Sequence, residues 1–198
     1  MDTIVLASGN KGKLAEFAAL FKASGVQTIP ISELVPIWQV EETGSTLHEN
    51  ALQKARAAMA VTGRPALADD SGLFVYYLGG EPGVYSQRYA GVGATDAENN
   101  ALLQRKLETS RGRRQAHFTA VLALVCPTGA EVTASGRLYG NITLVPRGVG
   151  GFGYDPIFEV RGTTLTLAEL SSQAKNKISH RAKAWQAMCT ALDLRNNG

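Results

Sequence analysis

Apolar positions along the first part of the chain alternate between short continuous runs and stretches with helical spacing. Residues 3–7 form a β-branched, apolar run that predicts a buried strand. Leucine and phenylalanine then recur at the spacing of one helix face through residues 13–23, and Gly25 follows as a suitable helix end. This strand and helix form the first predicted α/β unit of the chain.

Capping boxes predict where two further helices begin. "TLHE" at Thr46–Glu49 and "TDAE" at Thr95–Glu98 each place a threonine three residues before a glutamate, so that two backbone amides can be capped reciprocally. Helical spacing of apolar residues continues from the first box to Gly63 and from the second to Leu107.

The rest of the chain is rich in strand patterns. Residues 117–126 and 131–140 predict a hairpin across "PTGA", residues 157–160 predict one more strand, and residues 181–194 predict a closing helix. Neither an internal repeat nor a flexible linker interrupts the pattern. We therefore expect one α/β domain over residues 1–198, with a mixed β-sheet flanked by helices and two lobes with a cleft between them.

Composition narrows the class of protein. Hydrophobic content is 44% and charged content 19%, which argues against disorder. No apolar run approaches the roughly 20 residues of a membrane span, and we expect no membrane partner. A net charge of +3, with "RGRR" at Arg111–Arg114 as the one basic cluster, predicts no nucleic-acid partner. The start of the chain lacks a basic leader and its two cysteines lack a CxxC pattern, so we expect a cytoplasmic protein with reduced thiols.

The segment "LASGNKGKLAEF" at residues 6–17 looks like a phosphate-binding loop. It does not fit the Walker A pattern, because the spacing is wrong and Leu14 stands where a magnesium-binding hydroxyl is needed. Ser8, Asn10 and Lys13 nevertheless place polar groups at a helix start, where anions bind readily. An ordinary capped helix with a surface lysine explains the segment equally well.

A glycine-rich segment late in the chain is the second candidate. "GVGGFG" matches the spacing of a dinucleotide fingerprint, but it does not follow the first strand, and Pro156 interrupts any helix after it. We interpret it as a tight loop that lets a ligand approach the backbone, with Phe152 and Tyr154 as aromatic faces.

Two acidic pairs and a basic segment complete the candidate chemistry. Glu41 and Glu42 precede a capped helix, and Asp69 and Asp70 end an apolar run before a Ser-Gly turn. Each pair could bind Mg²⁺, or its residues could simply form a turn. "KNKISHR" at residues 175–181 could recognise carbonyl or phosphate oxygens, or could be a solvated helix start.

Six segments together, in this order, resemble the inosine/xanthosine triphosphate pyrophosphatase family, which removes aberrant purine nucleotides from the nucleotide pool. They are "ASGNKGKLAEF", "EETGSTLHENALQKA", "ALADDSGL", "LGGEPGVYSQRYAG", "GGFGYDPIF" and "ISHR", and they span residues 7–181. The resemblance implies an elongated mixed sheet in two lobes, a homodimer, and Mg²⁺-dependent hydrolysis of ITP, dITP and XTP to the monophosphate and pyrophosphate. The substrate partner is thus a purine nucleoside triphosphate.

The resemblance also implies roles for individual residues. Glu41 and Asp70 would bind Mg²⁺, and Asp70 would be the general base, with Ser71 touching the substrate beside it. The other expected substrate-binding residues fall into a phosphate loop and a base and sugar pocket: Ser8, Gly9, Asn10, Lys11, Gly12 and Lys13, then Phe152, Gly153, Tyr154, Asp155, Lys175, His180 and Arg181.

The base preference and the choice between Glu41 and Glu42 stay open. Donors from Lys175, His180 or Arg181 would favour the C6 oxygen of hypoxanthine or xanthine over the amino group of adenine. A pyrophosphatase with a different base preference is the first alternative, and a nucleotide-binding module without turnover is the second.

Overall fold

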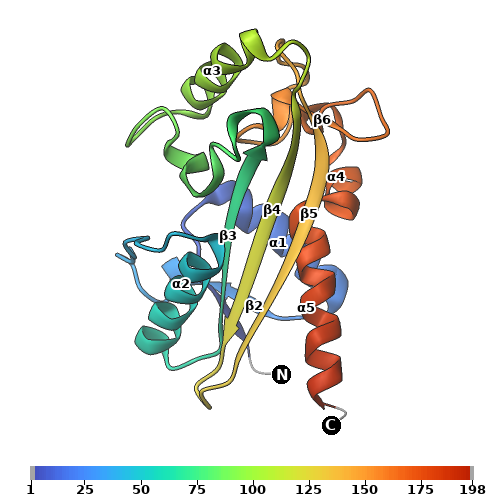
Figure 1. The fold of residues 1–198 in the computed structure, drawn as a ribbon. Coiled ribbons are helices and arrows are strands. Elements are labelled where there is room, and N and C mark those ends of the chain that lie inside the picture. The colour runs from blue at the N-terminus through green and yellow to red at the C-terminus, as the bar shows by residue number, and fades with distance from the viewer. Residues whose placement is uncertain (1–2, 197–198) are drawn as a thin grey trace. The chain divides into compact units, whose positions relative to one another are not determined.

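The computed structural model describes residues 3–196 and contains a six-stranded sheet in the order β2-β1-β3-β4-β5-β6 (Figure 1). β1 is parallel to β2 and β3, whereas β6 is antiparallel to β5. The predicted mixed α/β sheet flanked by helices is confirmed. The strands are β1 (Ile4–Leu6), β2 (Thr28–Pro30), β3 (Ala66–Val75), β4 (Gln115–Val125), β5 (Glu131–Ile142) and β6 (Phe158–Val160).

The helices begin and end where local sequence chemistry predicts. Both capping boxes form at their threonine N-caps, and Gly25 ends the first helix with a left-handed φ of 69°, a conformation that glycine adopts at little cost. The α-helices are α1 (Lys11–Ser24), α2 (Leu47–Thr62), α3 (Asp96–Leu107), α4 (Ser172–Ile178) and α5 (His180–Asn196). The short strand β2 and the helix α4 were not predicted from the sequence.

The segment "DDSG" at residues 69–72 lies in a strand, whereas the sequence suggested a turn there. Asp69, Asp70 and Ser71 lie inside β3, whose residues are buried except at two half-buried positions. Aspartate and serine favour turns when their side chains are solvated. Here the two carboxylates meet buried cations, so tertiary contacts override the local preference.

The chain divides into two compact units, with three boundaries inside β3, β4 and β5 and a fourth between α4 and α5. The first unit comprises residues 3–70, 120–136 and 180–196 of the described chain. Its core includes an edge-on contact between Phe21 of α1 and Trp185 of α5, with ring centroids 4.5 Å apart. The Trp185 Nε1 donates to Ser24 Oγ at 2.8 Å, which ties α5 to the end of α1.

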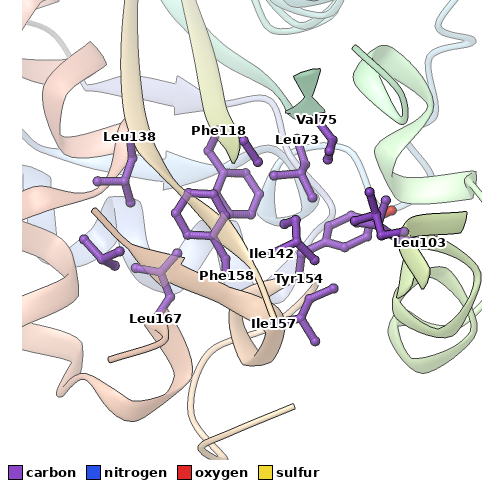
Figure 2. Packing of buried hydrophobic residues seen from close by; sticks show 13 residues of the cluster. Leu73, Val75, Leu103, Phe118, Leu138, Ile142, Tyr154, Ile157, Phe158 and Leu167 are labelled. Atoms are coloured by element: carbon purple, nitrogen blue, oxygen red, sulfur yellow. The ribbon is translucent and has the colours of Figure 1, made fainter. Parts of the chain in front are cut away.

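The second unit comprises residues 71–119 and 137–179 and has its own core (Figure 2). Phe118 of β4 and Phe158 of β6 pack with ring centroids 4.7 Å apart. Tyr154 joins this core with its ring buried and donates its hydroxyl hydrogen to Ser86 O at 2.8 Å. The glycine-rich loop is thereby anchored in the second unit.

Among residues 3–196, every helix is too short or too polar to cross a bilayer.

Candidate active site

The loop between β1 and α1 is shaped by the polar side chains that the sequence analysis selected. Asn10 caps α1 by accepting a hydrogen bond from Lys13 N at 3.0 Å, and Asn10 N donates to Ser8 Oγ at 3.2 Å. A methyl group on Gly9 would meet nothing within 4 Å, so open space adjoins the loop at this point. Lys11 is exposed and Gly12 half-buried in the first turn of the helix. The free amides and partial positive charge of such a turn suit an anionic ligand.

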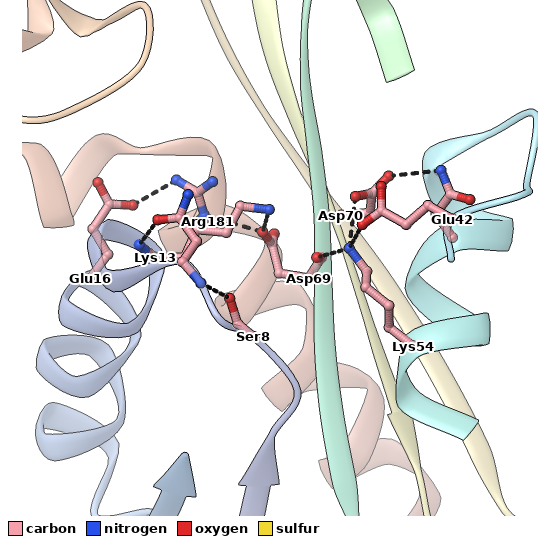
Figure 3. Close-up of polar contacts among 10 residues, drawn as sticks. Ser8, Lys13, Glu16, Glu42, Lys54, Asp69, Asp70 and Arg181 are labelled. Carbon is pink, nitrogen blue, oxygen red and sulfur yellow. Dashed lines mark hydrogen bonds and ion pairs between the residues drawn. The ribbon is translucent and has the colours of Figure 1, made fainter. Parts of the chain in front are cut away.

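Asp69 and Asp70 are adjacent on β3, so their side chains point to opposite faces of the sheet and contact different helices (Figure 3). On one face, Asp69 Oδ2 lies 2.7 Å from Lys13 Nζ of α1 and 3.4 Å from Arg181 Nε of α5. Arg181 NH1 also donates to Glu16 Oε2 of α1 at 2.8 Å. Glu16, Asp69 and Arg181 are buried and Lys13 is half-buried. Desolvation lowers the pKa of Lys13, although Asp69 partly opposes the shift.

On the opposite face, Asp70 meets a buried lysine of α2. Lys54 Nζ donates to Asp70 Oδ1 at 2.9 Å, to Glu42 Oε1 at 2.8 Å and to the Asp69 carbonyl oxygen at 2.8 Å. Asn50, one turn earlier on α2, donates to Asp70 Oδ2 at 3.3 Å. Two carboxylates thus converge on one cationic group.

Burial and the neighbouring charges together set the pKa values of Asp70 and Lys54. Desolvation raises the pKa of Asp70 above the usual value, although Lys54 and Lys13 act in the opposite sense. Burial alone would lower the pKa of Lys54, but the charges of Asp70 and Glu42 outweigh it, so that pKa is raised. A carboxylate with a raised pKa beside a fixed cation is a candidate general base.

This geometry favours Glu42 over Glu41 as the glutamate beside Asp70. Glu41 is exposed, whereas Glu42 is half-buried and paired with Lys54 beside Asp70. Asn50 fixes the end of the segment that carries both glutamates by accepting a hydrogen bond from Gly44 N at 2.8 Å.

The described residues contain no group of three or more histidine, cysteine, aspartate or glutamate side chains arranged to hold a metal ion. Glu42 and Asp70 instead form a pair of carboxylates that already faces a single cation. Magnesium commonly binds through one or two carboxylates and completes its shell with water and substrate phosphates. The donor chemistry of this pair therefore fits Mg²⁺.

In the second unit, the glycine-rich loop and Lys175 form a separate polar group. Asp155 Oδ2 accepts from Phe152 N at 2.9 Å and from the buried ammonium of Lys175. Lys175 Nζ also lies 4.8 Å from the centroid of the Phe152 ring. Gly153 has a left-handed φ of 62° between these residues. The result is a half-buried aromatic ring next to a cationic donor.

The remaining predicted residues have different positions. Ser71 follows Asp70 on β3 and is half-buried, and His180 is the buried first residue of α5. Arg181 belongs to the Asp69 cluster in the first unit. Tyr154 has its ring in the core of the second unit.

Several site residues were missed by the sequence analysis: Glu16, Asn50 and Lys54, with Asp69 and Glu42 named only as members of acidic pairs. A signal for Lys54 was present. It lies on the same face of α2 as the buried residues Leu47, Ala51 and Ala58, where a lysine is out of place unless it is paired.

Comparison with known proteins identifies relatives over nearly the full chain. The model of the Ham1 family matches residues 4–191. A dITP/XTP pyrophosphatase of Geobacter sulfurreducens is 48% identical over 185 residues, covering 93% of each chain. That of Bordetella pertussis is 49% identical over 199 aligned positions, covering 96% of this chain and 89% of the relative.

Solved structures agree in fold. A HAM1 protein from Coxiella burnetii matches with a TM-score of 0.87 and 46% identity, covering 98% of this chain and 99% of that one. The Ham1 protein of Staphylococcus aureus matches with a TM-score of 0.86 and 41% identity, covering 98% and 100%. The protein described here therefore belongs to the Ham1 family.

Proposed function

We propose that this protein is a Mg²⁺-dependent nucleoside-triphosphate pyrophosphatase that acts on ITP, dITP and XTP. The names of its relatives, which are dITP/XTP pyrophosphatases, support the reaction and two of these substrates. The observation that carries the proposal is the pair of aspartates on β3, each bound to buried cations on opposite faces of the sheet. Such a concentration of buried, opposite charges is typical of a site that handles a highly charged substrate.

The triphosphate is assigned to the loop between β1 and α1. The amides at the start of α1 and the ammonium of Lys13 supply positive charge, and Ser8 and Asn10 keep the loop in the conformation that presents them. Arg181 and Glu16 hold Asp69 and Lys13 in one buried network, so the ammonium has a fixed position before substrate arrives. Preorganised charge of this kind is the main source of catalysis in phosphoryl transfer.

The reaction is attack of water on the α-phosphorus with cleavage of the bond to the β-phosphate oxygen. Asp70 takes the proton from the attacking water, and pyrophosphate leaves with the electron pair of the cleaved bond. Lys54 and Asn50 orient the Asp70 carboxylate for this role. Glu42 and Asp70 would hold Mg²⁺, which supplies charge neutralisation for the phosphates.

The nucleobase is assigned to Phe152 and Lys175. The Phe152 ring offers a stacking face for any base, which adds affinity without selectivity. Lys175, fixed by Asp155, is a donor that favours a C6 oxygen and disfavours the amino group of adenine. A house-cleaning pyrophosphatase with another base preference is the alternative, and the same assay tests it.

The variant Asp70→Asn tests the proposal with Glu42→Gln and Glu41→Gln as a matched pair. We expect Asp70→Asn to lower kcat for ITP by roughly 10²- to 10⁴-fold, because the general base is lost. Glu42→Gln should raise the Mg²⁺ concentration needed for half-maximal rate, whereas Glu41→Gln should behave as the wild type. A nucleotide-binding module would show no pyrophosphate release in the wild type, and unchanged turnover in Asp70→Asn would exclude the assigned role.

The proposal also includes a homodimer and a cytoplasmic location, both implied by the family resemblance. Light scattering coupled to size-exclusion chromatography should give about twice the chain mass of 21.0 kDa. A monomer at micromolar concentration would contradict the dimer. Fractionation of cells should recover the protein with the cytoplasmic fraction.

A further inference from the structure

Helix α3 contacts the glycine-rich loop through two side chains that no catalytic assignment uses. Asp96 Oδ2 accepts a hydrogen bond from Gly153 N at 2.6 Å. Asn100 Nδ2 donates to Gly153 O at 3.0 Å. The two side chains are one helical turn apart on the same face of α3, so they hold both polar groups of one residue. Gly153 is therefore clamped from one side by the helix.

Gly153 lies between the two aromatic residues of the loop, Phe152 and Tyr154. Gly153 has φ of 62°, and a methyl group there would meet nothing within 4 Å, so open space adjoins its Cα. Tyr154 on one side is anchored in the core through Ser86, and Phe152 on the other is tied to Asp155 through its amide. Gly153 joins these two anchored residues, and its amide and carbonyl are held by Asp96 and Asn100.

We propose that Asp96 and Asn100 are positioning residues that set the orientation of the Phe152 ring through Gly153 and thereby control nucleobase affinity. The inference rests on the proposed assignment of Phe152 to the base. It adds a role for Asp96 and Asn100 of α3, which hold the backbone of the glycine-rich loop. The two residues should affect binding of the purine base and leave binding of the triphosphate unchanged.

Burial makes the two side chains unequal. Asn100 is 8% exposed, whereas Asp96 is exposed at the surface. Within the described residues, Asn100 Oδ1 is buried without a hydrogen-bond partner, so the amide nitrogen alone carries its interaction with the loop. Asn100→Asp keeps the shape but turns the donor to Gly153 O into an acceptor, which replaces attraction by repulsion.

The neighbouring Asn99 offers a matched control. It is 2% exposed, and it accepts from Ala90 N at 2.8 Å and donates to Gln87 O at 3.2 Å. Asn99→Asp therefore makes the same chemical change at the same depth, on the same helix, but against the segment 87–90 rather than Gly153. Any effect of general destabilisation should appear in both variants.

The test is the KM for ITP of the full-length enzyme with Mg²⁺, measured beside the inhibition constant of inorganic tripolyphosphate, which has no base. We expect Asn100→Asp to raise the KM for ITP by about tenfold and to leave the inhibition constant within about twofold. Asn99→Asp should leave the ratio of the two constants at the wild-type value. Equal changes in both constants for both variants, or an unchanged KM for Asn100→Asp, would overturn the inference.

The exposed partner gives a second test that does not depend on how well a core variant folds. Asp96→Ala removes the acceptor for Gly153 N and should raise the KM for ITP by about three- to tenfold, while Asp96→Asn, which retains an acceptor oxygen, should restore most of the affinity. An unchanged KM for Asp96→Ala contradicts the role of Asp96. Failure of the wild type to release pyrophosphate from ITP would instead refute the proposed function, so the two failures are distinguishable.

Discussion

Replacing Lys54 by methionine is expected to destabilise the protein and make its stability depend more strongly on Mg²⁺. Lys54 is the one ammonium between Glu42 and Asp70 in the described structure, and its side chain is only 10% exposed. Methionine has a similar length but no charge, so the variant leaves two carboxylates facing each other.

The magnitude follows from the burial of the three groups. Removing one member of a buried ion pair costs about 3–5 kcal/mol. The Asp70 side chain is 7% exposed but Glu42 is 25% exposed, so we take the lower end, about 3 kcal/mol. For a chain of this length, that corresponds to a melting temperature lower by about 6–12 °C.

The pH dependence of the variant has a defined sign. Without Lys54, the pKa of Asp70 rises further above its unfolded value, because its desolvation is no longer opposed by that charge. The folded state then binds more protons than the unfolded state, so the stability that protonated Asp70 contributes is lost as pH rises through its folded pKa. The difference from wild type should therefore be smaller at pH 4.5 than at pH 8.

Thermal melting with and without Mg²⁺ is the assay, and Arg56→Met is the control. Arg56 lies on the same helix and pairs with Glu131 at 2.7 Å, but its side chain is 57% exposed, so its loss should cost at most about 1 kcal/mol. We expect Mg²⁺ to raise the melting temperature of Lys54→Met more than that of the wild type, since the ion replaces the missing charge. A melting temperature within about 3 °C of wild type, or equal stabilisation by Mg²⁺, would refute the reasoning.

Two further predictions concern the pH profile of the reaction and the close packing of α5 against Gly136. Because burial raises the pKa of Asp70, kcat/KM for ITP should fall on the acid side at a higher pH than an exposed aspartate would give, and a profile flat to pH 4 would contradict this. Gly136 lies against α5, where a methyl group would stand 2.3 Å from both Ala184 N and His180 O. Gly136→Ala should therefore cost about 1–3 kcal/mol by denaturant unfolding and lower activity by displacing Arg181, and wild-type stability would contradict the close contact.

The elements of the fold were predictable because their signals are local. Capping boxes at Thr46 and Thr95 and the left-handed glycine at Gly25 are decided by residues within one turn, and each forms as predicted. The segment "DDSG" was not predictable in the same way. Its aspartates stay in a strand because Lys13, Lys54 and Arg181 neutralise them from distant parts of the chain.

In the candidate site, too, local features could be predicted from the sequence and contacts between distant residues could not. The candidate phosphate loop between β1 and α1 could be predicted from a strand followed by a capped helix, but the sequence left the choice between Glu41 and Glu42 open. Only the position of Lys54, which comes from a later helix, indicates that Glu42 lies beside Asp70. Lys54 itself was visible only as a lysine on a buried helix face. The contacts of Asp96 and Asn100 with Gly153 join residues more than 50 positions apart, and nothing in the spacing indicates them.

Product analysis of the purified protein with Mg²⁺ tests the central claim most directly. ITP, XTP, dITP, ATP, GTP and dTTP should be compared side by side, with pyrophosphate and orthophosphate measured separately. The account predicts fast release of pyrophosphate from ITP, XTP and dITP, with ATP and GTP nearly untouched. Release of orthophosphate, or equal rates on ATP and ITP, would contradict it.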